Sequence, residues 1–394
     1  MRYNIHSIFL TISVVLFSLG GQAQSCDSIV LNNQTAINNF IKNYGNCTTV
    51  RDLTITNSDN DITQLDSLYT IERITGTLLF TNQIQGREIN IGAFKGLKYL
   101  NNISSYYPLR FTGQFLALDT INELGIDNTF YTYPNIKHIG NSLSISDVSG
   151  THITEEDTPV FTTGENFALS ISNVDTTTLK VLSNRIMTAH LKSLRVGSGI
   201  IKRIDLSYLP ILDSLETLTL DSYKNSDLRQ ISTIRKLKVL EINNDGGGND
   251  YGQGLIHIRE LDRLWLSDGK PLRPYAYRDY KKILPNLEAL NKQLFVVWTD
   301  SLFNLDFLDN VRPPLASTLP DPTFFYSNEP IVLIENRFLN YCKSLFMCKA
   351  IKQYPERIYI KDNYASRCTL EDIAKYCETV STEDKHIKSL SLSP

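Results

Sequence analysis

A short pattern of an apolar residue, any residue and a second apolar residue recurs along the chain. From the copy at Leu143 onward it returns after steps of 26, 25, 24, 22 and 24 residues. Sequence periods of about 20 to 50 residues are typical of solenoids and propellers. The clearest copies begin at Leu53, Leu78, Leu143, Leu169, Leu194, Leu218, Leu240 and Leu264, and a further copy is Ile358-Tyr359-Ile360.

Between these segments the apolar residues recur at every third position, as at Leu228, Ile231, Ile234 and Leu237. An α-helix turns about 100° per residue and a strand alternates every two residues, so neither suits a strict three-residue step. A chain that turns a corner every few residues places all these side chains inside one tube. We therefore expect a mainly β fold, a right-handed parallel β-solenoid with strands about 4.8 Å apart. Asparagines that follow the strands suit the bends, where they can bond backbone groups or their copies in the next turn: Asn57, Asn82, Asn173 and Asn243.

Helical patterns are found at the two ends of the chain. Thr35 can cap a helix with Ile37 and Phe40 on one face, and Thr369 precedes a second helix with Asp372 at the capping-box position. Separate amphipathic helices are the alternative to a solenoid, but caps and i, i+4 spacing are scarce inside the repeats. Because stacked coils leave open sheet edges, we expect these helices to form polar caps.

The cysteines also lie near the two ends. In an exported protein an even number of cysteines implies disulfides. Their grouping predicts a bond between Cys26 and Cys47 and two bonds among the last four, for which three pairings are open. Zinc binding is the alternative, but zinc sites favour closer spacing. The six cysteines are Cys26, Cys47, Cys342, Cys348, Cys368 and Cys377.

Residues 1–23 have the pattern of a secretory signal peptide. Arg2 precedes the uncharged apolar run Ile8–Leu19, and small residues lead to a cleavage point near Ala23. The run is shorter than the ~20 residues of a membrane-spanning helix, and no later stretch is long and apolar enough. We expect a secreted or cell-surface protein. Lipid attachment at Cys26 is the alternative, although the residues before it lack the apolar side chain that such a site favours.

With these features the chain resembles the secreted receptor-L-domain-like, leucine-rich-repeat-type surface proteins of bacteria that use type IX secretion. The segments 37–50 and 339–377 are similar to the two end modules of that family. The resemblance implies attachment to the outer surface through the secretion machinery. Two stretches, 101–135 and 270–340, break the period, and one continuous solenoid or two halves both remain open. The implied parts are a cap at 24–48, solenoid repeats at 49–339, a four-cysteine cap at 340–378, and a linker at 379–394 that we expect to lead into a missing sorting domain.

Residues that carry chemistry are scattered along the sequence. The histidines form no metal-binding or nucleophilic motif, and no phosphate-binding loop occurs. The glycine-rich segment Asp245–Gly254 resembles a single calcium-binding repeat, but one copy favours a loop. We therefore expect no enzyme activity, no metal site and no cofactor. Four acids can line one face as in polysaccharide-cleaving β-helix enzymes, but about one acid per turn is typical of a solvated surface: Asp205, Asp213, Asp221 and Asp227.

The candidate binding segment is residues 270–282, where basic and tyrosine side chains alternate. This combination suits a protein or an anionic glycan, and a loop over the solenoid flank is the alternative. With 39 basic and 42 acidic side chains, the chain is not expected to bind nucleic acid. We expect recognition or adhesion through an extended solenoid face; the alternatives are a carbohydrate-active β-helix enzyme and a structural surface-layer component. The candidate residues are Lys270, Arg273, Tyr275, Tyr277, Arg278, Tyr280, Lys281 and Lys282.

Overall fold

The structure, a computed structural model, divides the chain into two compact units. Unit 1 holds residues 1–125, 129–140 and 153–162, and unit 2 holds residues 126–128, 141–152 and 163–394. The residues that the structure describes are 25–45, 47–56, 61–81, 88–105, 110–112, 115–126, 135–146, 160–172, 174, 176–187, 191–197, 208–209, 212–221, 228, 231–243, 254–267, 280–299, 302, 304–315, 329–336, 339, 342–363 and 368–390.

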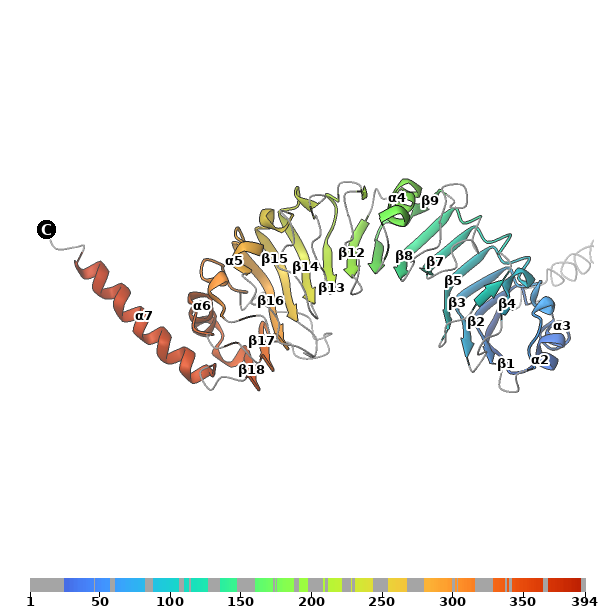
Figure 1. The fold of residues 1–394 in the computed structure, drawn as a ribbon. Coiled ribbons are helices and arrows are strands. Elements are labelled where there is room, and N and C mark those ends of the chain that lie inside the picture. Colours follow the sequence, from blue (N-terminus) through green and yellow to red (C-terminus); the bar gives the residue numbers. More distant parts are fainter. Residues whose placement is uncertain are drawn as a thin grey trace, which may run out of the picture. The chain divides into compact units, whose positions relative to one another are not determined.

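Unit 1 is built on parallel strands that follow one another in sequence order (Figure 1). Each strand pairs in parallel with the next one along the chain. Two short strands, β4 (Glu88–Asn90) and β6 (Arg110–Thr112), form a separate parallel pair. The main strands, from the outer edge, are β1 (Ser25–Leu31), β2 (Thr49–Thr56), β3 (Arg73–Thr81), β5 (Tyr99–Ser105) and β7 (Thr120–Ile126).

Unit 2 repeats the same arrangement with more strands. It begins within β8 (His138–Ser146) and ends at the edge strand β18 (Ile358–Lys361). The neighbours along the sheet are again parallel. Two short strands lie off this order: β11 (Ile186–Met187), and β9 (Phe161–Thr163), of which only Thr163 belongs to unit 2. The strands between β8 and β18 are β10 (Phe167–Ser172), β12 (Leu191–Gly197), β13 (Thr217–Asp221), β14 (Lys236–Asn243), β15 (Glu260–Ser267), β16 (Ala289–Val297) and β17 (Ile331–Ile334).

The leucines of the repeated pattern stack in register. In unit 2, Leu194, Leu218, Leu240 and Leu264 are direct partners on successive strands, and each is at most 1% exposed. In unit 1, Leu53 and Leu78 are paired in the same way. Side chains two residues apart on a strand share one face, so the sheet turns a continuous apolar face inward. The expectation of a mainly β, parallel-stranded solenoid is confirmed.

The three-residue apolar period corresponds to 3₁₀ turns. Leu228, Ile231 and Ile234 are buried, and the amides of Ile231 and Ile234 each donate to the carbonyl three residues earlier, at 3.0 and 2.9 Å. In a 3₁₀ turn, side chains at i and i+3 eclipse, which explains why all of them face one core. The regular 3₁₀ helices are η1 (Asp66–Leu68), η2 (Ile91–Ala93), η6 (Leu255–His257), η7 (Asp306–Leu308) and η9 (Pro355–Arg357).

Helices occur near both ends of the chain, as expected, but the first begins elsewhere than predicted. The side chain of Asn33, not of Thr35, accepts the capping hydrogen bond, from the amide of Ala36. Near the other end, Thr369 does cap, because its hydroxyl accepts from the amide of Asp372 and donates to the Asp372 carboxylate. A helix within the repeats, α4, was not expected. The helices are α2 (Gln34–Asn38), α3 (Phe40–Tyr44), α4 (Thr176–Arg185), α5 (Tyr280–Ile283), α6 (Leu345–Gln353) and α7 (Leu370–Leu390).

The disulfides follow the predicted grouping. Cys26 and Cys47, which lie on either side of α2 and α3 in the sequence, form a disulfide with a Cα–Cα distance of 6.0 Å. The last four pair as Cys342 with Cys368 and Cys348 with Cys377, at Cα–Cα distances of 5.4 and 5.3 Å. Such bonds indicate an oxidising environment. Of the helices in the described ranges, none has both the length and the apolar character needed to cross a bilayer.

Asparagines bridge the last coils at the ends of their strands. Asn336, which is fully buried, accepts hydrogen bonds from the amide and hydroxyl of Thr299 at 3.0 and 2.7 Å. Its own amide nitrogen donates to the carbonyl of Val296 and to Oδ1 of Asn363. This is the role expected of asparagine after a strand, although at other positions than those named from the sequence. Of those, Asn243 bonds side chains instead, and the others lie outside the described residues.

Candidate functional site

The segment singled out from the sequence is only partly described. Lys281 and Lys282 lie on α5 and are exposed. Tyr280 is 2% exposed, and its ring centroid lies 5.4 Å from that of Phe307, so this tyrosine belongs to the core. The remaining candidates lie outside the described residues: Lys270, Arg273, Tyr275, Tyr277 and Arg278. Of the glycine-rich segment, only Gly254 lies within the described residues. Of the four acids, Asp205 and Asp227 lie outside the described residues.

The middle residue of each repeated triplet points away from the core. In unit 2 these residues are direct partners across successive strands, and we call them the outward row. Along the row the side chains change from hydroxyls through charged groups to large apolar groups. The members are Ser144, Ser170, Arg195, Thr219, Glu241, Trp265, Phe295, Val332 and Tyr359.

A polar cluster occupies the charged part of this row and the ends of its strands, and it comprises Arg195, Thr219, Asp221, Glu241 and Asn243. The Arg195 guanidinium on β12 forms an ion pair with Asp221 at the end of β13. Asn243 Nδ2, at the end of β14, donates to Asp221 Oδ1 at 3.0 Å and to Glu241 Oε1 at 2.7 Å. Thr219 Oγ1 donates to Glu241 Oε2 at 3.1 Å. Three strands therefore hold two carboxylates in fixed positions.

The polar cluster is accessible and chemically versatile. The Arg195 side chain is 59% exposed, and that of Asp221 is 22% exposed. A carboxylate has about four lone-pair sites, so each acid retains acceptor capacity beyond its bonds in the protein. Charge-assisted hydrogen bonds are about twice as strong as neutral ones. The cluster can therefore accept hydrogen bonds from hydroxyl or amide groups of a ligand and offer guanidinium N–H donors beside them.

An apolar part of the outward row adjoins the polar cluster. The rings of Trp265 and Phe295 stack with centroids 4.0 Å apart and an interplanar angle of 26°. Phe295, Val297 and Val332 form a small buried cluster, against which Trp265, Trp298 and Ile334 pack. Tyr359, at the edge strand, is 39% exposed. A ligand that crosses β12–β15 would therefore meet polar groups first and an aromatic side chain next.

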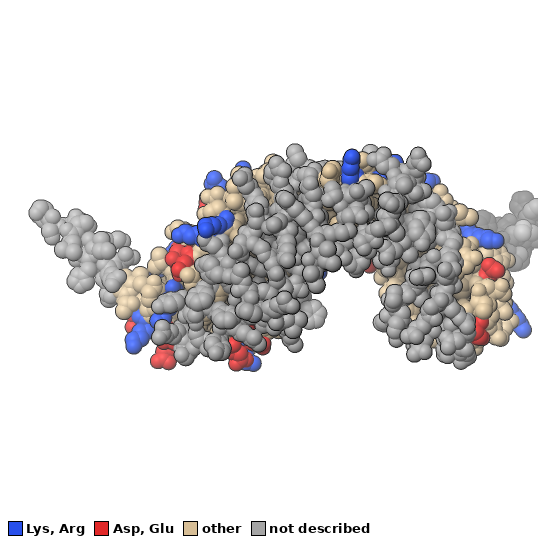
Figure 2. Space-filling model, in the orientation of Figure 1, with Lys and Arg blue, Asp and Glu red and all other residues tan. Residues whose placement is uncertain are grey.

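Charges at the starts of the strands alternate in sign. Glu216 on the coil of β13 lies between Lys192 and Lys238 from the coils on either side. The hydrogen bond from Lys238 is the main cause that holds the pKa of Glu216 below its ordinary value, and the hydrogen bond from Lys192 adds to it. On the face shown in Figure 2, the described basic and acidic residues lie in small mixed groups. Among the described residues, this alternation balances the charges of neighbouring coils.

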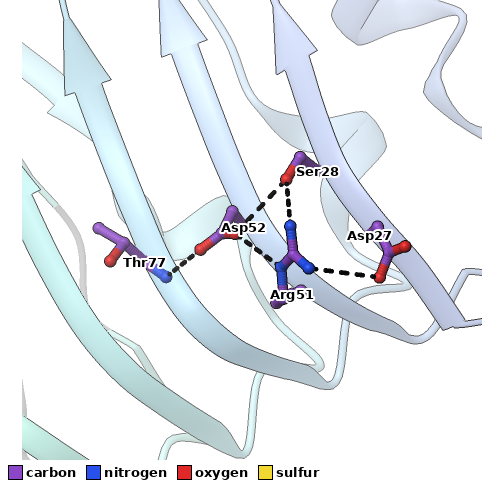
Figure 3. Close-up of polar contacts among 5 residues, drawn as sticks. All are labelled: Asp27, Ser28, Arg51, Asp52 and Thr77. Atoms are coloured by element: carbon purple, nitrogen blue, oxygen red, sulfur yellow. Dashed lines mark hydrogen bonds and ion pairs between the residues drawn. The ribbon is translucent and has the colours of Figure 1, made fainter.

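Unit 1 has its own polar group on the outward side of β1–β3 (Figure 3). The carboxylate of Asp52 accepts from the Thr77 amide at 3.0 Å and from Arg51 Nε at 2.9 Å. The hydrogen bond from the Thr77 amide is the main reason that the pKa of Asp52 is lowered, and the hydrogen bond from Arg51 lowers it further. The same hydrogen bond to Asp52 raises the pKa of Arg51. A Cβ atom at residue 76 would overlap the Asp52 carboxylate, so this position requires glycine. We regard this group as structural.

The polar cluster was not expected, although the sequence contains a signal for it. Arg195, Thr219, Glu241 and Trp265 are the middle residues of triplets whose outer leucines revealed the repeat. Once those leucines are stacked in register, their neighbours must form a row on the opposite face. Among the described residues, no group of three or more histidine, cysteine, aspartate or glutamate side chains is arranged to hold a metal ion.

Comparison of the chain with protein-family models, with curated protein sequences and with solved structures finds no match.

Proposed function

We propose that this chain is an exported recognition protein that binds a protein or glycan ligand along the outward face of its sheet. The observation that carries the proposal is the polar cluster of unit 2, in which Arg195 and two carboxylates are held across three strands beside Trp265. Stacked repeats make extended surfaces in place of deep pockets. A surface of this kind suits an extended polymer better than a small molecule.

The chemistry of the cluster favours a ligand rich in hydroxyl or amide groups. Glu241 and Asp221 are acceptors, and Arg195 supplies planar, paired donors. Trp265 adds a rigid apolar side chain with a single N–H donor, a combination that is enriched at binding surfaces. Because these groups are held by hydrogen bonds among themselves, little conformational entropy is lost when a ligand engages them.

Binding of the purified protein to a glycan array and to a panel of matrix proteins tests the proposal. We expect at least one ligand to bind, and the double substitution Arg195→Gln with Glu241→Gln to weaken it by about tenfold or more, since each charge-assisted bond contributes about 1.5–3 kcal/mol. The matched control is Arg51→Gln, which removes an outward arginine from unit 1. Equal binding by the double variant and the wild type would exclude the polar cluster as the site.

The export part of the proposal rests on the sequence of residues 1–23, on the resemblance to type IX secreted surface proteins and on the disulfides. In this proposal α2 and α3 cap one end, and α6 and α7 the other. Amino-terminal sequencing of the protein recovered from the medium of producing cells is expected to read from Gln24. An intact Met1 in the recovered protein would contradict cleavage.

One observation favours a second candidate, a carbohydrate-active enzyme. Asp221 and Glu241 both accept from the same nitrogen, Asn243 Nδ2, so their carboxylates lie close together. Retaining glycosidases use two carboxyl groups about 5–5.5 Å apart. Release of sugar from a polysaccharide panel, abolished by Glu241→Gln, would support the enzyme. Binding without release would support the recognition protein.

A further inference from the structure

The edge strand β18 has an open side that lines a groove. The strand order of the sheet ends at β18, which pairs only with β17 among the strands of the described chain. A cavity of about 350 Å³ runs beside it, lined by the whole strand, by Asp362 and Asn363, and by Cys368, Thr369 and Leu370 at the start of α7. The Cys342–Cys368 disulfide fixes the wall opposite the strand.

The backbone of β18 directs hydrogen-bonding groups toward this groove. The carbonyl of Lys361 accepts from the amide of Glu335, which directs Lys361 toward β17. Because the backbone groups of successive strand residues point to opposite sides, Ile360 and Ile358 direct their amides and carbonyls into the groove. An unpaired strand edge of this kind is a template for another extended chain.

The outward row indicates which side chains an added strand would need. Val332 is fully buried, whereas Tyr359, the next residue in register and on the last strand of the described sheet, is 39% exposed. An added strand with an aromatic or β-branched residue in register with Tyr359 would extend the apolar part of the row by one rung. Cross-strand pairs of this kind stabilise the pairing of neighbouring strands.

The charges around the groove balance. At one end of β18, Arg357 is bound to Glu329 at 3.2 Å, and at the other, Lys361 faces Asp362 at 3.5 Å. The described residues that line the groove carry one positive and one negative side chain, Lys361 and Asp362, and this balance favours an uncharged strand over a polyanion. Pairing of two copies through β18, centred on Tyr359, would place Lys361 of each copy opposite Arg357 of the other. Because each of these cations is already paired with its own carboxylate, charge gives that arrangement no advantage.

We propose that β18 binds an extended segment of a partner protein by strand addition, with apolar residues alternating with uncharged polar ones. This mode takes its affinity from main-chain hydrogen bonds and its specificity from alternate side chains. It does not depend on the polar cluster.

Fluorescence anisotropy with a labelled synthetic peptide, in which valine and phenylalanine alternate with threonine, tests the proposal. Ile360→Pro removes the donor that faces the groove and no bond to β17, so proline is tolerated there as at other strand edges. We expect the wild type to bind, and Ile360→Pro to bind at least about tenfold more weakly while it still unfolds in a single cooperative transition. Asp27→Asn in unit 1 is the matched control and should bind as the wild type does.

A second probe keeps the test decisive if Ile360→Pro fails to fold. The same peptide, methylated on the amide nitrogens of alternate residues, keeps its apolar side chains but cannot pair with a strand edge. We expect the wild-type protein to lose affinity for it about tenfold or more. Equal binding of both peptides, no binding of either, or concentration-dependent dimerisation abolished by Ile360→Pro would each overturn the proposal.

Discussion

Single residues on the outward face of unit 1 show how local bonds fix an exposed carboxylate. Asp52 is held by a backbone amide from the next coil and by the arginine that precedes it, and Gly76 leaves the room it needs. The charge of Asp52 is therefore more stable in the folded chain than in the unfolded chain.

Asp52 gives a pH prediction. Because its folded pKa lies below the ordinary value of 3.8, its contribution to stability is present above that pH and is lost as the pH falls through the folded pKa. We expect Asp52→Asn to lower the free energy of unfolding at pH 7 by about 1 kcal/mol or less, given its partial exposure, and to have no effect at the most acidic pH. Urea unfolding over the pH range measures this.

The control for Asp52 is Asp27→Asn. Asp27 is 82% exposed and lies 3.9 Å from Arg51, so its removal should leave stability nearly unchanged at every pH. Equal pH profiles for both variants would contradict the role given to the Thr77 amide.

A core leucine gives a second prediction at the residue scale. Leu240 is fully buried between Leu218 and Leu264, its partners in register. Leu240→Ala leaves a cavity that rigid neighbouring coils cannot close, so we expect a loss of about 2–5 kcal/mol in urea unfolding. Ser170→Ala, on the outward row, should change stability by less than about 0.5 kcal/mol. A loss below about 1 kcal/mol for Leu240→Ala would show that the coils collapse around the cavity.

The last coils are joined by the asparagine bridge that runs through Asn336. This residue ties the end of β16 to the end of β17 through Thr299 and Val296, and Asn363 extends the bridge to β18. The bridge therefore fixes the register of the strands that carry the apolar part of the outward row.

Asn336→Ala is expected to cost at least about 2 kcal/mol, because it leaves buried donors and acceptors without partners. Hydrogen exchange should accelerate first at β16 and β17. The matched variant Asn243→Ala, whose partners are surface side chains, should cost less than about 1 kcal/mol. Similar losses of stability for the two variants would mean that burial of the bridge adds nothing to its contribution to stability.

The sequence predicted the elements of the sheet because leucine spacing is imposed by the core. It could not predict the helix boundaries equally well: Asn33 and Thr35 are both good cap residues, and Asn39 ends α2 at its fifth residue. Nor could it predict the polar cluster, since Arg195 and Asp221 are 26 residues apart and meet only once β12 and β13 are in register. Contacts between coils depend on register, which composition and period do not specify.

At the scale of the whole molecule, the disulfides join segments around the two ends of the chain. The Cys348–Cys377 bond closes a separation of 29 residues and the Cys26–Cys47 bond one of 21. Replacing either pair by serine should cost about 3–4 kcal/mol by the loop-entropy relation. Thermal unfolding with and without reductant measures this; a variant that melts like the oxidised wild type would show that the bond adds no stability.

The order of the last four cysteines has a consequence for biosynthesis. Cys342 and Cys348 emerge first from the ribosome, yet each bonds a cysteine that lies beyond β18. An oxidase that joins cysteines as they appear would link the wrong pair. Correct maturation therefore requires that both thiols wait for the carboxyl-terminal segment, or that a disulfide isomerase repairs the first product. Cells that lack such an isomerase should accumulate a form with a non-native Cys342–Cys348 bond.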